Sequence, residues 1–192
     1  MTEHSVRVVP GSADRLDDVI TILGAGEREC LCQYWRLSSG DYSRSTQPTR
    51  IANLRRQLAD DPPAGMIAYI GDEPVGWLGF GVRQRVERLV RSRTIPVIDD
   101  LPVWSIFCFT VRVGYRRHGV ARALLAGLVE YARESGAPAL EAYPVDTDGE
   151  RIHGTAAYVG VASMFEAAGF VRVVETDARS ERLPRWLMRL EL

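Results

Sequence analysis

The sequence contains no lysine, because all 24 of its basic side chains are arginines. Catalysis through a lysine Schiff base is therefore excluded. Cysteine and histidine are also scarce, with three residues of each. The odd number of cysteines gives no disulfide framework, and too few histidines accompany Cys30 and Cys32 for a local zinc site. We therefore expect no metal ion, and we interpret Cys30, Cys32 and Cys108 as structural thiols.

Long apolar runs are missing as well, since none approaches the roughly 18 to 20 residues that cross a bilayer. The N-terminus has no charged-then-apolar signal segment. Acidic and basic side chains balance at 25 against 24, for a net charge of −1. This balance gives no long-range attraction for nucleic acid or an anionic membrane surface. We expect a cytoplasmic protein with neither of these as a partner.

The length of 192 residues and a hydrophobic fraction of 46% suit one folded domain over residues 1–192. Periodicity and turn residues predict an α/β chain. A strand, a helix and a strand between residues 103 and 143 predict a crossover with parallel strands. The turn Gly71-Asp72-Glu73-Pro74 predicts an antiparallel hairpin. The expected strands cover 6–9, 66–70, 75–82, 103–111, 136–143, 170–175 and 186–192. The expected helices run from a cap at Ser12 or Asp14 to Leu23, from a first turn with Pro48 towards Asp60, from 120 to 135 and from 158 to 168.

The most informative segment runs from Val111 to Ala121, Val-Arg-Val-Gly-Tyr-Arg-Arg-His-Gly-Val-Ala. It joins the expected strand 103–111 to the most regular of the expected helices. Free N–H groups and the dipole at that helix start attract phosphate, and Gly119 allows a close backbone approach. Positive charge gathers at the same point. The segment therefore predicts an anion site formed with Arg116, Arg117, His118 and Arg122.

The spacing Arg116-x-x-Gly119-x-Ala121 resembles the pyrophosphate loop of the GNAT superfamily of acyl-CoA-dependent N-acetyltransferases. A second stretch, Phe165-Glu-Ala-Ala-Gly-Phe170, is similar to the aromatic-x-x-x-Gly-Phe helix end of that superfamily. The order of the expected elements also agrees. This resemblance covers about residues 103–175, whereas 25–64 and 83–102 match no motif.

The resemblance implies a single-domain fold with a mixed central sheet of about six or seven strands, splayed at the acyl-CoA site and flanked by helices. Acetyl-CoA would enter where the strand ending at Val111 separates from the strand ending near Tyr143. The residues that the resemblance assigns to this co-substrate are Phe109, Thr110, Val111, Arg116, Arg117, His118, Gly119, Val120, Ala121, Arg122 and Tyr158.

The implied reaction is direct attack of a primary amine on the thioester in a ternary complex. The backbone N–H of Val111 is the expected oxyanion donor. The amine must lose a proton, for which Glu141 and Asp146 are the candidate carboxylates. The alternative for Glu141 is a salt-bridged strand glutamate.

Relatives commonly carry a tyrosine at the position of Phe165, where its hydroxyl can protonate the leaving sulfur. That hydroxyl is missing here. We expect Tyr143 to supply one and Tyr158 to contact the co-substrate, so Tyr143→Phe should reduce turnover more than Tyr158→Phe. The alternative function, favoured by Phe165, is a catalytically idle acyl-CoA-binding or regulatory module.

The acceptor could be a small-molecule or a peptide amine, and a homodimer is left open. The expected walls of the acceptor site are the segments 27–46, 83–102 and 146–157. Trp35 is the test residue of the first segment, with simple core packing as its alternative role.

Overall fold

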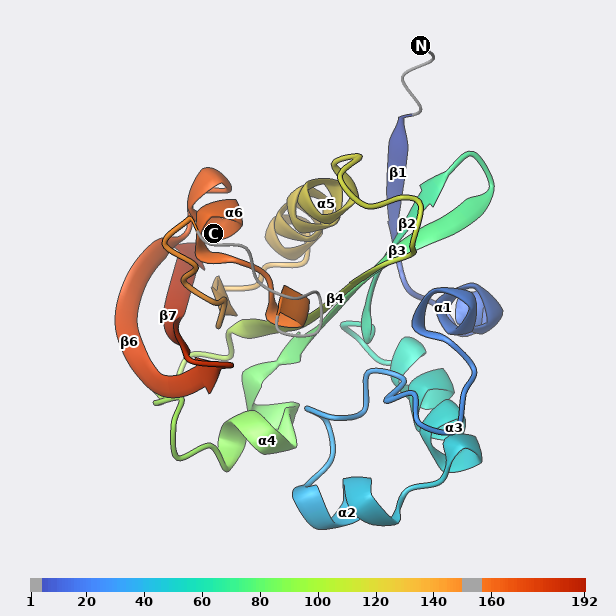
Figure 1. Cartoon of the computed structure of the whole chain (residues 1–192), viewed down its shortest axis with the longest axis horizontal. Coiled ribbons are helices and arrows are strands. Elements are labelled where there is room, and N and C mark those ends of the chain that lie inside the picture. The colour runs from blue at the N-terminus through green and yellow to red at the C-terminus, as the bar shows by residue number, and fades with distance from the viewer. Residues whose placement is uncertain (1–4, 150–156) are drawn as a thin grey trace.

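A sheet of seven strands runs through the computed structural model, which describes residues 5–149 and 157–192 (Figure 1). The strand order is β1-β2-β3-β4-β5-β7-β6. Of the strand pairs described, β4 and β5 are parallel and the others antiparallel. The expected mixed sheet is therefore confirmed. Its strands are β1 (Val6–Pro10), β2 (Gly65–Ile70), β3 (Glu73–Val82), β4 (Trp104–Val111), β5 (Ala139–Ala142), β6 (Val171–Ser180) and β7 (Leu183–Glu191).

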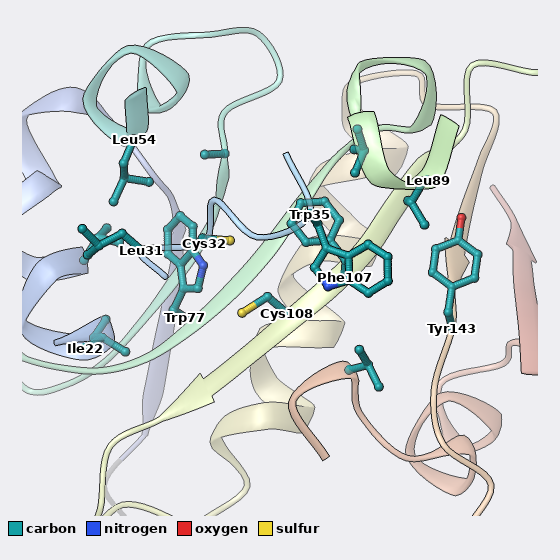
Figure 2. Close-up of a cluster of buried hydrophobic side chains, with 14 of the residues drawn as sticks. Ile22, Leu31, Cys32, Trp35, Leu54, Trp77, Leu89, Phe107, Cys108 and Tyr143 are labelled. Atoms are coloured by element: carbon teal, nitrogen blue, oxygen red, sulfur yellow. The ribbon is translucent and has the colours of Figure 1, made fainter. Parts of the chain in front are cut away.

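Helices cover both faces of the sheet, and each face has its own apolar core. The face with α5 and α6 is packed by the apolar stripe of α5 and by Phe165. The other face is packed by side chains of α1, α3 and α4 (Figure 2). The α-helices are α1 (Leu16–Leu23), α2 (Ser39–Arg44), α3 (Gln47–Leu58), α4 (Glu87–Val90), α5 (Val120–Glu134) and α6 (Ala162–Ala167), and the short 3-10 turns are η1 (Ala13–Arg15), η2 (Arg83–Arg85) and η3 (Ala157–Val159).

The expected crossover is confirmed, with α5 leading from β4 to the parallel strand β5. The expected helix 158–168 is wrong as one continuous element. Gly160 has a φ of +82°, which a right-handed helix cannot contain, so the segment divides into η3 and α6. The strand expected at 170–175 extends to Ser180, because β6 pairs with β7 along a polar stretch that carries no alternation signal.

A bulge in β4 changes which way its side chains face. Gly79 of β3 pairs with Cys108, but the next residue of β3, Phe80, pairs with Ile106. Phe107 is therefore the extra residue, as in a β-bulge. Phe107 and Cys108 both join the core on the α1, α3 and α4 side, while Ile106 lies in the core beside α5.

No helix among the described residues is both long enough and apolar enough to span a bilayer.

Gly65 tests the packing between β2 and β3. A Cβ at this position would lie 2.3 Å from the Leu78 carbonyl oxygen and 2.5 Å from the Trp77 ring. Relieving this clash would require the backbone of β3 to shift. Gly65→Ala should therefore lower the free energy of unfolding by about 2 to 3 kcal/mol in urea titrations.

Gly26→Ala is the control, since its Cβ would meet its nearest neighbour at 3.5 Å. It should change the free energy of unfolding by less than about 0.5 kcal/mol. Equal urea midpoints for the two variants would contradict the packing described for Gly65.

Candidate active site

The parallel strands β4 and β5 stay together over only three residue pairs, from Trp104–Leu140 to Ile106–Ala142. Beyond that point β5 ends, whereas β4 continues to Val111. Two paired strands satisfy each other's backbone groups only along the edge that they share. The last part of β4 therefore has an edge that β5 does not cover.

The backbone of Val111 faces this uncovered edge. The N–H of Arg112 donates to the carbonyl of Val75 on β3, at 2.9 Å. Because hydrogen bonding alternates from residue to residue along an antiparallel pair, the N–H and C=O of Val111 point away from β3. Its carbonyl accepts a hydrogen bond from Arg116 Nε at 3.2 Å. The N–H is thus presented to the gap between β4 and β5.

A groove of about 1290 Å³ follows this edge to the start of α5. It brings together ten of the eleven residues expected to contact acetyl-CoA, while His118 is exposed and lies outside its lining. The ten are Phe109, Thr110, Val111, Arg116, Arg117, Gly119, Val120, Ala121, Arg122 and Tyr158. Residues that the sequence did not predict also line the groove, namely Glu29, Cys30, Tyr115, Ala157, Val161, Ser163 and Met164.

The loop before α5 is shaped by backbone conformations that favour glycine. Gly119 is the N-cap of α5 with a φ of +76°, and a Cβ there would meet nothing within 4 Å. The first helical bond runs from the N–H of Ala123 to the carbonyl of Gly119. The N–H groups of residues 120–122 therefore have no partner within the helix. Three arginines lie around these donors, and the first turn of α5 contains no acidic residue. The site is therefore suited to binding a diphosphate.

An apolar cavity of about 380 Å³ adjoins the groove, and we call it the inner cavity. It shares Cys30 and Tyr158 with the groove. Burial raises the pKa of Tyr158 and also that of the Cys30 thiol. The complete lining is Cys30, Cys32, Tyr34, Trp35, Cys108 and Tyr158.

A third space of about 490 Å³, the outer cavity, opens beside the hairpin of β6 and β7. It shares Tyr34, Trp35 and Tyr158 with the inner cavity. Tyr158 thus lines the groove and both cavities, so the three spaces follow one another. The expected segment 27–46 supplies Trp35 to this series, but of the segment 83–102 only Thr94 takes part. The part of the third expected wall at 150–156 lies outside the described residues.

Glu141 and Tyr143 form a buried polar network instead of facing the groove. The Tyr143 hydroxyl donates to Glu141 Oε2 at 3.0 Å and accepts from Arg83 Nη1 at 2.7 Å. Ser105 Oγ lies 2.9 Å from the same hydroxyl. Glu141 is also within ion-pair distance of Arg83 and Arg189, at 3.6 and 4.0 Å. Neither residue lines the groove or the two cavities.

The pKa values in this network follow from its burial. Burial raises the pKa of Glu141, although Arg83 and Arg189 act in the opposite direction. Burial also raises the pKa of Tyr143. Figure 2 shows Tyr143 at the end of the core cluster away from Trp77. The geometry therefore corresponds to the salt-bridged alternative for Glu141.

Two further sequence candidates also lie apart from the groove lining. Asp146 forms an ion pair with Arg172, which lowers the pKa of Asp146. Phe165 is fully buried and packs edge-to-face on Phe109 and Phe170, with ring centroids 5.9 and 5.1 Å apart. Phe165 thus supports the wall of the groove from behind, through Phe109.

The chain is similar to one known protein family and, in its fold, to several solved structures. Residues 29–160 match the Acetyltransferase (GNAT) family. No curated protein matches the chain by sequence. The fold is similar to that of a GNAT-family acetyltransferase from Streptococcus pneumoniae, with 17% identity, a TM-score of 0.58, and coverage of 98% of this chain and 99% of that one.

Two other solved structures have the same fold at similar distance. A ribosomal-protein-alanine N-acetyltransferase from Brucella melitensis is 18% identical, with a TM-score of 0.58 and coverage of 97% of this chain and 99% of that chain. The PaiA N-acetyltransferase from Thermoplasma acidophilum, solved in complex with coenzyme A, is 11% identical with a TM-score of 0.55 and coverage of 98% and 99%. At these identities the similarity establishes the fold.

Tyr143→Phe tests whether the buried network is structural. The change removes a hydroxyl that joins Glu141, Arg83 and Ser105. Because two of these partners are charged and buried, the free energy of unfolding should fall by about 2 kcal/mol.

Tyr158→Phe is the matched control, since Tyr158 is only half-buried. It should change the free energy of unfolding by less than about 1 kcal/mol in the same urea titration. If Tyr143→Phe were as stable as the wild-type protein, the network would not contribute to the fold.

Proposed function

The chain belongs to the Acetyltransferase (GNAT) family, and on this premise we propose that it transfers the acetyl group of acetyl-CoA to a primary amine. The transfer takes place by direct attack in a ternary complex, within a single domain over residues 1–192. The observation that carries the proposal is the groove that leads from the start of α5 along the uncovered edge of β4. The acceptor is a small-molecule or peptide amine, and a cytoplasmic location is part of the same proposal.

Binding of acetyl-CoA is proposed to use the two ends of the groove differently. At the start of α5, the free N–H groups and the guanidinium groups of Arg116, Arg117 and Arg122 hold the diphosphate. The open space beside Gly119 allows the phosphates to approach the backbone. Along β4, the backbone from Phe109 to Val111 holds the pantetheine arm, with Tyr158 and the wall of the groove opposite. His118 stays a proposed contact of the same loop.

The bound co-substrate supplies a thioester carbonyl that an amine can attack. The Val111 N–H, which points into the gap, donates to the carbonyl oxygen as negative charge develops on it. A donor of this kind is worth about 3 kcal/mol of barrier. The apolar inner cavity beside it keeps competing water away from the amine.

Proton movement is proposed to involve Tyr158. Burial raises the pKa of its hydroxyl, so the group keeps its proton at neutral pH and can donate to the leaving sulfur, while the amine proton passes to solvent water through the open groove. Glu141 and the Tyr143 hydroxyl are proposed to act through the buried network and not on the substrate, while the backbone carbonyl of Tyr143 positions Arg185 by accepting from its Nε at 2.8 Å. Our sequence expectation that both act on the substrate gains no support from their burial.

The direct test of the proposed function is a screen of primary amines with acetyl-CoA, in which free CoA and the acetylated amine are both quantified. The proposal expects the two products in equal amounts. Tight binding of acetyl-CoA without transfer to any amine would instead favour the idle acyl-CoA-binding module.

Gly119→Val tests the diphosphate site. A valine there fills the space beside the helix start and should weaken acetyl-CoA binding at least about tenfold in calorimetric titration, which is ~1.4 kcal/mol. The attraction is partly ionic, so wild-type binding should also weaken as salt is added.

Gly136→Val is the matched control for Gly119→Val. Gly136 has a φ of +72°, and a Cβ there also meets nothing within 4 Å. Both valines therefore carry similar backbone strain, of about 1 to 2 kcal/mol. Gly136 follows the other end of α5, so its variant should keep wild-type affinity, and equal weakening in both variants would contradict the proposed site.

Tyr158→Phe and Tyr143→Phe separate turnover from stability. With an accepted amine, Tyr158→Phe should lower kcat at least about tenfold, or ~1.4 kcal/mol of barrier. Tyr143→Phe should keep kcat per folded molecule within about threefold of the wild-type value, since the Tyr143 hydroxyl lies outside the groove. This is the reverse of the order expected from the sequence, and the original order would restore Tyr143 as the acting hydroxyl.

A further inference from the structure

Arg185 on β7 is a buried arginine whose charge has no carboxylate partner among the described residues. It is 5% exposed. Its Nε donates to the Tyr143 carbonyl, but Nη2 is buried and finds no hydrogen-bond partner within residues 5–149 and 157–192. Burial lowers the pKa of Arg185, and the groups near enough to oppose this effect are the phenols of Tyr158, Tyr143 and Tyr34.

Two of the other three buried arginines of the described structure have a carboxylate nearby. Arg50 has none within the described ranges, but both of its Nη atoms donate to backbone carbonyls and it lines none of the three spaces. Arg83 lies 3.6 Å from Glu141 and donates to the Tyr143 hydroxyl. Arg189 lies four residues after Arg185 on β7 and forms an ion pair with Asp99. A buried charge without an opposite charge is costly. A bound anion would therefore supply the opposite charge that the surroundings of Arg185 lack.

Arg185 lines the outer cavity. Its guanidinium lies over the Trp35 ring, with the central carbon 5.5 Å from the ring centroid. The Trp35 Nε1 is buried and also has no hydrogen-bond partner among the described residues. Arg185 and Trp35, which both line the outer cavity, thus each keep one unsatisfied donor.

The charge around the entrance does not neutralise Arg185. Asp177 and Glu181 line the outer cavity, but both are exposed to solvent. No ion pair connects either of them with Arg185 in the described structure, and neither acts on its pKa. Exposed carboxylates are strongly screened, whereas a buried guanidinium is not. Arg185 is therefore the dominant charge for a ligand that fills the cavity.

We infer that the acceptor amine carries a carboxylate at the far end of an apolar body, and that Arg185 binds this carboxylate. The inference rests on the proposed function, since it assigns the amine to the groove beside Val111. The inner cavity of about 380 Å³ lies between the groove and the outer cavity and takes the apolar body. A guanidinium binds a carboxylate with two parallel hydrogen bonds, which no neutral or cationic group can replace.

The test compares ω-amino carboxylates of four, six and eight carbons with the alkylamines and α,ω-diamines of the same lengths. At the length that is acetylated best, the amino carboxylate should exceed the alkylamine in kcat/KM by about thirtyfold, as charge-assisted hydrogen bonds allow. The diamine should be the poorest acceptor, because its second ammonium group meets Arg185.

Arg185→Gln should reduce the preference for the carboxylate to about onefold, and Arg185→Lys should restore it only in part, since a lysine keeps the charge but not the planar fork. The preference is a ratio measured within one variant, so partial unfolding does not affect it. Arg182→Gln is the matched control. It removes a charge from the exposed turn of the same hairpin, outside the cavity lining, and should keep the wild-type ratio.

Calorimetric titration with CoA present gives a readout that needs no turnover. The best amino carboxylate should bind the wild-type protein at least about tenfold more tightly than its alkylamine, and Arg185→Gln should remove the difference. Equal binding of the two ligands would overturn the inference about Arg185. Equal kcat/KM values for the amino carboxylate and the alkylamine would also overturn the inference about Arg185, but would leave the acetyltransferase function intact. Binding with the expected preference but without acetylation would contradict the proposed function alone.

Discussion

The early end of the pairing between β4 and β5 is the constraint on which the rest of the site depends. Because β5 stops at Ala142, the backbone of Val111 has a free edge, and the groove can follow it to the start of α5. The bulge at Phe107 adds to this effect, since it turns Cys108 toward the inner cavity. The groove and the two cavities thus depend on two local departures from regular sheet pairing.

Much of the groove could be predicted from the sequence, because its signals are local. A glycine at a helix start, flanked by arginines, forms an anion site in any fold that joins a strand to a helix at this point. The groove accordingly brings together Arg116, Arg117, Gly119 and Arg122 as expected. The expected helix 120–135 corresponds to α5, because its apolar stripe has one period throughout.

The buried network and the cavity around Arg185 could not be predicted in the same way, because the residues that form them come from distant parts of the chain. Alternation placed Glu141 and Tyr143 on one face of a strand, but it could not show that Arg83 would occupy that face. A signal for Arg185 was nevertheless present. It alternates in phase with Leu187, which is fully buried in β7, and an arginine in such a position needs a partner.

Acetyl-CoA is proposed to lie along the free edge of β4 with its diphosphate at the start of α5, and backbone amide NMR can locate it there. Titration with acetyl-CoA should shift the amide signals of Val111 and of residues 119–122 most, while the signal of Gly136 beyond the other end of α5 stays in place. Shifts concentrated around the hairpin of β6 and β7, with Val111 and residues 119–122 unchanged, would contradict the account.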